Sequence, residues 1–75
     1  MIQDTIKNII AKQMKVDVTK VKDTTTFEEL QADSLDVVEV IMAIESQFSI
    51  KLSDEMVESL KTVSELAKYV EELLA

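Results

Sequence analysis

Apolar residues recur at helical intervals in three separate stretches of this chain, and that periodicity limits the folds open to it. Spacings of i, i+4, i+7 and i+8 place side chains on one face of an amphipathic helix. The first stretch, residues 2–14, shows this spacing at Ile2, Ile6, Ile9, Ile10 and Met14. The pattern predicts an all-α protein whose helices bury their apolar faces against one another.

Three further helices are expected after the first. The second begins near Asp33 or Ser34 and ends at about Phe48, and Ser53 can cap a short third helix that ends near Leu60. Residues 62–65 read Thr-Val-Ser-Glu, a capping box that predicts the start of a fourth helix. The side of the fourth helix expected to be buried carries Leu66, Val70, Leu73 and Leu74.

The connection between the first two helices, residues 15–33, has no clear period. Val16, Val18 and Val21 alternate with polar residues, as in a short strand, but a lone strand would have no partner. We therefore expect a long loop that contains one helical turn near residues 26–29. Phe27 and Leu30 are expected to attach this loop to the core.

The chain of 75 residues contains no glycine, proline or cysteine. Any turn that needs a positive φ must therefore use Asp, Asn, Lys or Gln at some strain. Without disulfides, packing alone must hold the fold, and 47% apolar residues can supply it. We expect one domain, residues 1–75, folded as a small four-helix bundle with a short third helix and a long loop between helices 1 and 2.

The second helix has two apolar stripes instead of one. The stripe expected to face the core contains Val37, Val40, Ile41, Ile44 and Phe48. Leu35, Val38 and Met42 form another stripe that points largely away from the first. Either the helix is buried on both sides, or this outer stripe is a docking surface with acids at its rim. A chain this short can hardly enclose a helix, which favours docking.

Charge is distributed unevenly along the chain, whose net charge is −7. Residues 1–27 hold five lysines against three acids (+2), residues 28–58 hold one lysine against nine acids (−8), and residues 59–75 contribute −1. The acidic centre is either a merely solubilising surface or a site that attracts basic proteins, and it would repel nucleic acid and anionic membranes. Without a membrane-spanning run or a secretory signal, a cytoplasmic protein is expected.

Ser34 has no neighbour that could activate it as a nucleophile. The chain has no histidine or cysteine for a catalytic triad and no glycine-rich phosphate loop, so we expect a protein that is not an enzyme. Ser34 is then either a simple helix cap or the target of another enzyme. A phosphodiester on it would meet the helix N–H groups, although Asp33 and Asp36 would oppose its charge. The acidic clusters lack a defined ligand loop, so no metal site is predicted.

The segment around Ser34 resembles a known family signature. Residues 30–36, Leu-Gln-Ala-Asp-Ser-Leu-Asp, are similar to the Leu-Gly-Ala-Asp-Ser-Leu-Asp motif of fatty-acid-type acyl carrier proteins, and residues 38–45 continue the similarity. Asp54-Glu55, Thr62-Val63 and Tyr69-Val70 fit the later helices of that family. Gln31 stands where the family usually has glycine, and Ser53 where proline is common.

The resemblance implies that Ser34 carries 4'-phosphopantetheine, loaded from coenzyme A by a phosphopantetheinyl transferase, and that Asp33 and Leu35 on either side belong to the same cofactor-binding site. Acyl chains would then travel as thioesters on this arm to the enzymes of fatty-acid synthesis, with the carrier a monomer. Basic patches on those partners would meet a face made of Asp36, Val38, Glu39, Met42, Glu45 and Glu55. The acyl chain would enter a pocket lined by Ile44, Phe48, Leu52, Val57, Leu60 and Ala67.

Two other functions remain open from the sequence. The chain could be a carrier of a polyketide, peptidyl or lipid A pathway, although Ala32-Asp33 before the serine favours the fatty-acid type. It could instead be a helical adaptor that binds proteins through the outer stripe of the second helix. In that case Ser34 would be only a cap and would receive no modification.

Overall fold

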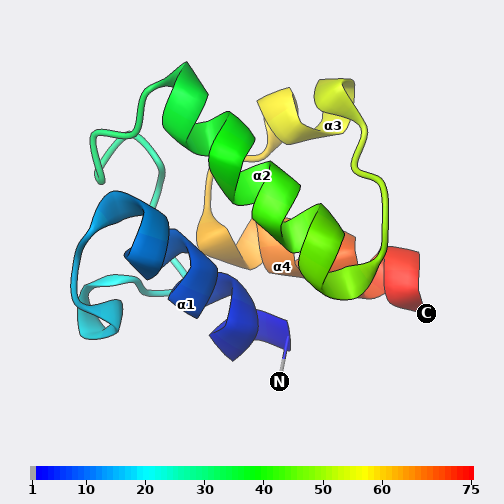
Figure 1. Ribbon diagram of the computed structural model, residues 1–75, viewed down its shortest axis with the longest axis horizontal. Coiled ribbons are helices and arrows are strands. Elements are labelled where there is room, and N and C mark those ends of the chain that lie inside the picture. The colour runs from blue at the N-terminus through cyan, green and yellow to red at the C-terminus, as the bar shows by residue number, and fades with distance from the viewer. Residues whose placement is uncertain (1) are drawn as a thin grey trace.

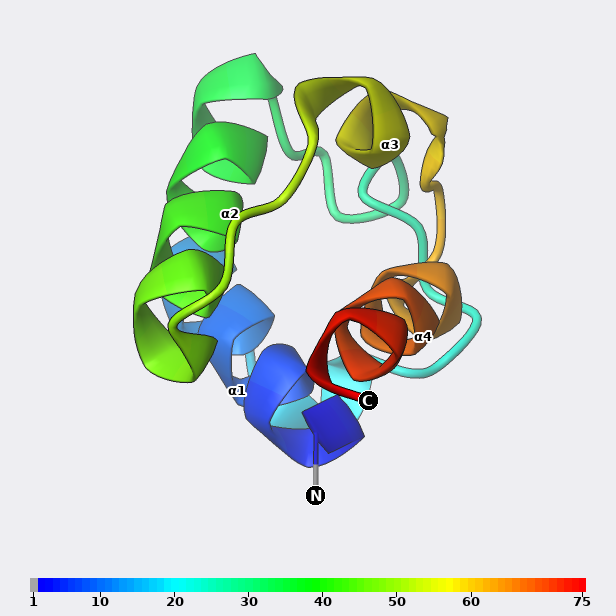
Figure 2. The same cartoon turned by 90° about the vertical axis from the view of Figure 1, so that its right-hand side faces the viewer.

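The computed structural model describes residues 2–75. In this part of the chain, four α-helices surround one apolar core, and Figures 1 and 2 show how the helices are arranged. These residues form no β-strand, so the prediction of an all-α fold is confirmed. A 3₁₀ helix, η1 (Val18–Lys20), lies in the connection that precedes the second helix. The α-helices are α1 (Ile2–Met14), α2 (Ser34–Phe48), α3 (Asp54–Ser59) and α4 (Val63–Leu74).

The core lies where α1 packs against both α2 and α4. Each of these helices contributes side chains that water does not reach, and full burial of one such side chain stabilises the fold by roughly 1.5–3 kcal/mol. The predicted inner faces of α1 and α2 are therefore confirmed. The largest side chains with less than 2% exposure are Ile6, Ile10, Val40, Ile44, Val63, Leu66 and Val70.

The last turn of α4 differs from the prediction. Leu66 and Val70 are buried as expected, but Leu73 and Leu74 keep 42% and 43% of their surface exposed. Both residues continue the apolar face of α4, yet the last turn lies at the edge of the molecule, where little of the bundle covers it (Figure 1). The expectation that they belong to the buried side was wrong.

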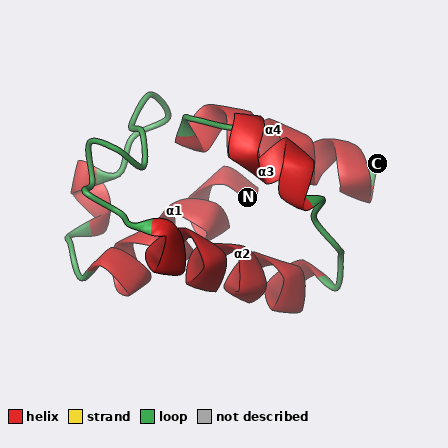
Figure 3. Cartoon of the chain, turned by 90° about the horizontal axis from the view of Figure 1, so that it is seen from above, coloured by secondary structure: helices red, strands yellow, loops and turns green. Residues whose placement is uncertain are grey.

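The connection between α1 and α2 is long, as predicted, and forms one end of the molecule (Figure 3). The sequence did not reveal η1, which Asp17 caps by accepting a hydrogen bond from the Thr19 N–H at 2.9 Å. The helical turn expected near residues 26–29 is present, because the Leu30 N–H donates to the Thr26 carbonyl at 3.3 Å. Phe27 and Leu30 pack on the core as expected.

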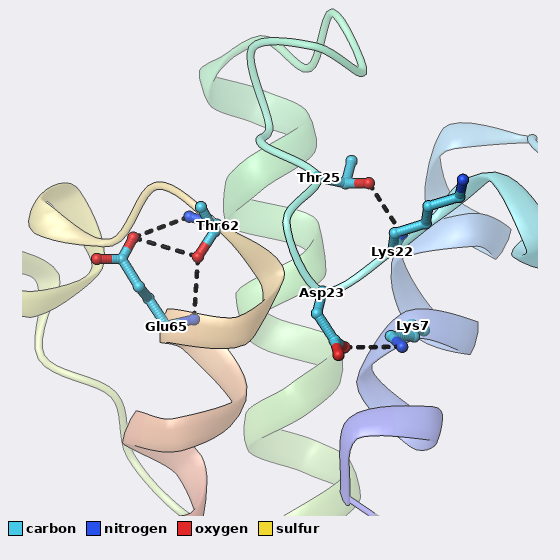
Figure 4. A network of polar contacts seen from close by, with 6 residues as sticks. All are labelled: Lys7, Lys22, Asp23, Thr25, Thr62 and Glu65. Carbon is cyan, nitrogen blue, oxygen red and sulfur yellow. Dashed lines mark hydrogen bonds and ion pairs between the residues drawn. The ribbon is translucent and has the colours of Figure 1, made fainter.

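Backbone hydrogen bonds join this connection to the start of α4. The Val63 N–H donates to the Thr25 carbonyl at 3.0 Å, and the Ser64 N–H donates to the Asp23 carbonyl at 2.9 Å. The Asp23 carboxylate also pairs with the Lys7 ammonium of α1 at 2.8 Å (Figure 4). The segment before α2 is thereby fixed to both α1 and α4, although it contains little regular structure.

The predicted capping box at the start of α4 is confirmed. The Thr62 hydroxyl accepts from the Glu65 N–H at 3.1 Å, and one Glu65 carboxylate oxygen accepts from the Thr62 N–H at 3.0 Å (Figure 4). The same carboxylate oxygen also accepts from the Lys61 N–H at 3.0 Å. These donors favour the ionised carboxylate, and they hold the pKa of Glu65 below its ordinary value of 4.5.

We expect the stabilisation from this cap to be lost in acid. Because the pKa of Glu65 is lowered by folding, its contribution is complete above pH 4.5 and disappears as the pH falls through the folded pKa. Glu65→Gln can accept the same hydrogen bonds without a charge. Urea unfolding of both proteins should show that the free energy of unfolding of wild type exceeds that of the variant at about pH 6 and that this difference is lost by about pH 3. A difference that stays constant over this range would contradict the prediction.

Candidate functional site

Asp33, and not Ser34, caps helix α2. The Asp36 N–H donates to an Asp33 carboxylate oxygen at 2.9 Å, and the Asp33 N–H donates to an Asp36 carboxylate oxygen at 3.2 Å. Ser34 is the first residue of α2, and its exposed side chain makes no hydrogen bond within residues 2–75. The sequence left the choice of cap open, and the structure leaves the Ser34 hydroxyl uncommitted.

The turn before this serine contains one of the three residues that have a positive φ within residues 2–75. Gln31 has φ 59°, and the other two are Lys15 at 58° and Ser49 at 55°. Lys and Gln were expected to fill such turns in a chain without glycine, whereas Ser was not. Gln31 thus adopts the conformation that glycine takes most easily. The Gln31 N–H donates to the Glu28 carbonyl at 3.0 Å, which closes the turn.

Substitution of Gln31 should therefore depend on the side chain in a specific way. The left-handed conformation costs a residue with a Cβ about 1–2 kcal/mol, a cost that glycine avoids. The greater freedom of glycine in the unfolded chain cancels about 0.4–1 kcal/mol of this stabilisation. We expect Gln31→Gly to raise the free energy of unfolding by roughly 0.5–1 kcal/mol and Gln31→Val to lower it. Chemical denaturation of wild type and of both variants measures these changes, and a lower free energy of unfolding for Gln31→Gly would contradict the prediction.

The outer stripe of α2 is exposed, as predicted. Leu35, Val38 and Met42 keep 64%, 50% and 61% of their surface in contact with solvent. The alternative, in which α2 is buried on both sides, was wrong. Exposed large apolar side chains that lie together on one helix are typical of a binding surface.

The four acids expected in the partner-binding face differ in their surroundings. Glu39 is exposed and accepts a hydrogen bond from the side-chain amide of Gln13 in α1. Glu45 is half-buried, and its carboxylate accepts from the Leu52 N–H at 2.8 Å, which holds the loop after α2. Glu55 is exposed in the first turn of α3. Asp36 is half-buried in the cap of α2, so Glu39 and Glu55 are the more accessible of the four carboxylates.

A cavity of about 590 Å³ lies between α2 and α3. Ser34 belongs to its lining, so a group attached there would begin beside an apolar space. The other lining residues come from the α1–α2 connection, from α2, and from α3 and the residue after it: Phe27, Val37, Val38, Ile41, Met42, Glu45, Asp54, Val57, Glu58 and Leu60.

The predicted acyl pocket overlaps this cavity only in part. Val57 and Leu60 line it, whereas Ile44, Leu52 and Ala67 are buried in the core and Phe48 packs at the edge of the core. Val37 and Ile41 were assigned to the core alone, although they line the cavity. They lie on the flank of the inner stripe, next to the outer one, which a helical projection of the sequence could have shown.

Helix α3 is the least anchored of the four helices, since none of its residues is buried. Its cap is Ser53, whose hydroxyl accepts from the Met56 N–H at 3.5 Å, as the sequence predicted. The Ser53 N–H donates to the Tyr69 hydroxyl of α4 at 3.2 Å. Proline, common at this position in the family that the chain resembles, could not make that bond because it has no N–H.

Chemically, the site offers an exposed hydroxyl and an adjacent apolar space. Within residues 2–75, no three acidic side chains come close enough together to hold a metal ion. None of the helices described here has both the length and the apolar character needed to cross a bilayer. A hydroxyl without a neighbouring base can be a substrate of another enzyme, but it is a weak nucleophile by itself.

Comparisons with known proteins agree with this arrangement. The model of the family "Phosphopantetheine attachment site" matches residues 4–70. The acyl carrier protein of Helicobacter hepaticus is 45% identical over 69 residues, which cover 91% of each chain. A crystal structure of an acyl carrier protein from Thermotoga maritima has a TM-score of 0.79 at 30% identity, covering 93% of this chain and 82% of its own. A free-standing peptidyl carrier protein from Acinetobacter baumannii has a TM-score of 0.86 at 22% identity, covering 97% and 91%, and it shares the fold.

Proposed function

Because this chain belongs to the acyl carrier protein family, defined by its phosphopantetheine attachment site, we propose that Ser34 is the residue that receives the 4'-phosphopantetheine arm. The chain carries acyl groups in fatty-acid synthesis, and its family consists of carriers and not of catalysts. The single observation that carries the assignment to Ser34 is its exposed hydroxyl, which the capping box of Asp33 and Asp36 leaves free.

The residues around Ser34 fit a phosphodiester. The N–H groups of Ser34 and Leu35 lie in the first turn of α2, where no earlier turn of the helix supplies carbonyl acceptors for them. They can meet a phosphate oxygen, and the positive end of the helix dipole favours its charge. Asp33 and Asp36 oppose that charge, which supports a covalent link over reversible binding. The arm supplies the thiol that a chain without cysteine lacks.

The acyl chain of the cargo is proposed to enter the cavity between α2 and α3. Its lining is largely apolar, and it begins at Ser34, so a chain on the arm needs only to fold back toward its own attachment point. Val57 and Leu60 on the α3 side then face Val37 and Ile41 on the α2 side across the chain. Because α3 has no buried residue, moving it outward to enlarge the cavity breaks few core contacts.

Partner enzymes are proposed to dock on the outer face of α2. Val38 and Met42 would supply the desolvated contact, and Glu39 with Glu55 would attract basic patches on the transferase and on the enzymes of fatty-acid synthesis. Such charges act mainly on the rate of encounter and on the choice of partner. The chain is proposed to act as a monomeric one-domain carrier in the cytoplasm.

A peptidyl or polyketide carrier is the second candidate, because a peptidyl carrier protein shares this fold. The identity of 45% to an acyl carrier protein, against 22% to that peptidyl carrier, supports the fatty-acid type. Enzymes of the two pathways can separate the candidates. A fatty-acid condensing enzyme should accept the acylated arm of this carrier, and peptide synthetase domains should not.

Loading provides the direct test of the proposed function. The purified protein is incubated with coenzyme A, Mg²⁺ and a phosphopantetheinyl transferase, and its intact mass is measured. We expect the mass to rise by one phosphopantetheinyl group, which peptide mapping should locate on the segment that contains Ser34. An unchanged mass in the presence of a transferase that loads another carrier would contradict the proposal.

A further inference from the structure

A second hollow lies on the α1 side of α2 and shares no lining residue with the cavity beside Ser34. Its volume is about 620 Å³, and α1 with the residue that follows α1 forms one wall while α2 forms the other. The lining residues are Ile9, Lys12, Gln13, Lys15, Glu39, Ala43 and Gln47.

Charges of both signs meet in this hollow. Lys12 and Lys15 are exposed, and neither makes an ion pair within residues 2–75; the ion pair found there joins Lys7 to Asp23. On the opposite wall, the Glu39 carboxylate accepts a hydrogen bond from the Gln13 side chain, which fixes its position between the two helices. The hollow therefore presents two unpaired ammonium groups beside one oriented carboxylate.

Glu39 makes the hollow continuous with the proposed docking face. It follows Val38, which is exposed on the outer stripe of α2 and also lines the cavity near Ser34. A partner that reaches Glu39 from this stripe comes to the edge on which Lys12 and Lys15 lie. Its surface would then face negative charge along α2 and positive charge along the end of α1.

We propose that Lys12 and Lys15 form a basic edge of the docking face, which selects protein partners that carry an acidic side chain beside their basic patch. The inference rests on the proposed function, because it concerns the same docking surface. A uniformly basic partner would place like charges next to the two lysines, which is unfavourable, whereas a partner of mixed charge gains attraction at both walls. The edge would also fix the orientation of the bound enzyme relative to Ser34.

The backbone at Lys15 allows both charges to be removed without strain. Lys15 has φ 58°, a conformation that glycine adopts easily, and Lys12 is an exposed residue in the last turn of α1, where alanine is a good helix former. The variant Lys12→Ala/Lys15→Gly changes the net charge from −7 to −9. Lys61→Ala/Lys68→Ala is the matched control, since it makes the same change at exposed positions outside the hollow.

Binding of the three proteins to the transferase and to a condensing enzyme from the same cell tests the proposal. If net charge alone mattered, both double variants would bind basic partners more tightly. We expect the control to bind as well as wild type or better, and Lys12→Ala/Lys15→Gly to bind about three- to tenfold more weakly. This loss should shrink at high ionic strength, because salt screens exposed charges.

The possible outcomes distinguish failure of the basic edge from failure of the proposed carrier function. Equal or tighter binding by Lys12→Ala/Lys15→Gly, with wild type still binding and still loaded at Ser34, would overturn the basic edge and leave the carrier function intact. Absence of binding and of loading in wild type would overturn the proposed function, and the basic edge with it. Circular dichroism and thermal unfolding of both variants establish that they remain folded.

Discussion

Ser34→Ala should abolish loading and leave the fold unchanged. The attachment reaction needs the serine oxygen, so the variant is expected to gain no mass with coenzyme A and a phosphopantetheinyl transferase. Because Asp33 forms the cap of α2 and the Ser34 side chain makes no hydrogen bond within residues 2–75, loss of the hydroxyl should change the free energy of unfolding by no more than about 0.5 kcal/mol.

Asp33→Ala is the matched variant, because it removes the cap and keeps the hydroxyl. Loss of an N-cap side chain costs about 0.5–2 kcal/mol, so this variant should be clearly less stable than Ser34→Ala while still accepting the arm. Denaturant unfolding and intact mass, measured on the same samples, distinguish the two. The opposite result, a destabilised but loaded Ser34→Ala, would mean that Ser34 is the cap and that the arm is attached elsewhere.

The helices could be predicted from the sequence because their signals are local. The inner stripe of α2 and the Thr62–Glu65 capping box depend on spacing along one segment, and both agree with the structure. Leu73 and Leu74 follow the same periodicity but are exposed, since burial requires a neighbouring element as well as an apolar face. η1 was missed because a three-residue helix capped by Asp17 has no periodicity to detect.

The segment that contains the site could be predicted from the sequence, whereas the residues that line the cavity were predicted only in part. Exposure of the outer stripe followed from an excess of apolar residues on one helix, which a small bundle cannot enclose. The lining of the cavity depends on how α3 lies against α2, and no local pattern specifies that placement. The contact of Gln13 with Glu39 joins residues 26 positions apart, so the hollow between α1 and α2 was equally hidden.

Ile44→Ala should destabilise the protein strongly. Ile44 is completely buried and lies outside the lining of the cavity near Ser34, although it was predicted to contact the acyl chain. Truncation of a buried isoleucine to alanine costs about 2–5 kcal/mol. A domain of this length is stabilised by roughly 4–11 kcal/mol in total, so we expect a large fall in the urea midpoint in both the unloaded and the acylated protein.

Leu60→Ala, measured in the same experiment, distinguishes the effect of a residue that lines the cavity from that of a core residue. Leu60 is half-buried after the end of α3 and lines the cavity, so its truncation should cost the unloaded protein only about 1 kcal/mol. An acyl chain that occupies the cavity binds the folded state alone and stabilises it. Leu60→Ala should reduce this gain in stability on acylation because the chain loses a contact, whereas Ile44→Ala should leave the gain largely intact. If Ile44→Ala removed the gain and Leu60→Ala did not, the chain would lie among the core residues, as the sequence first indicated, and not between α2 and α3.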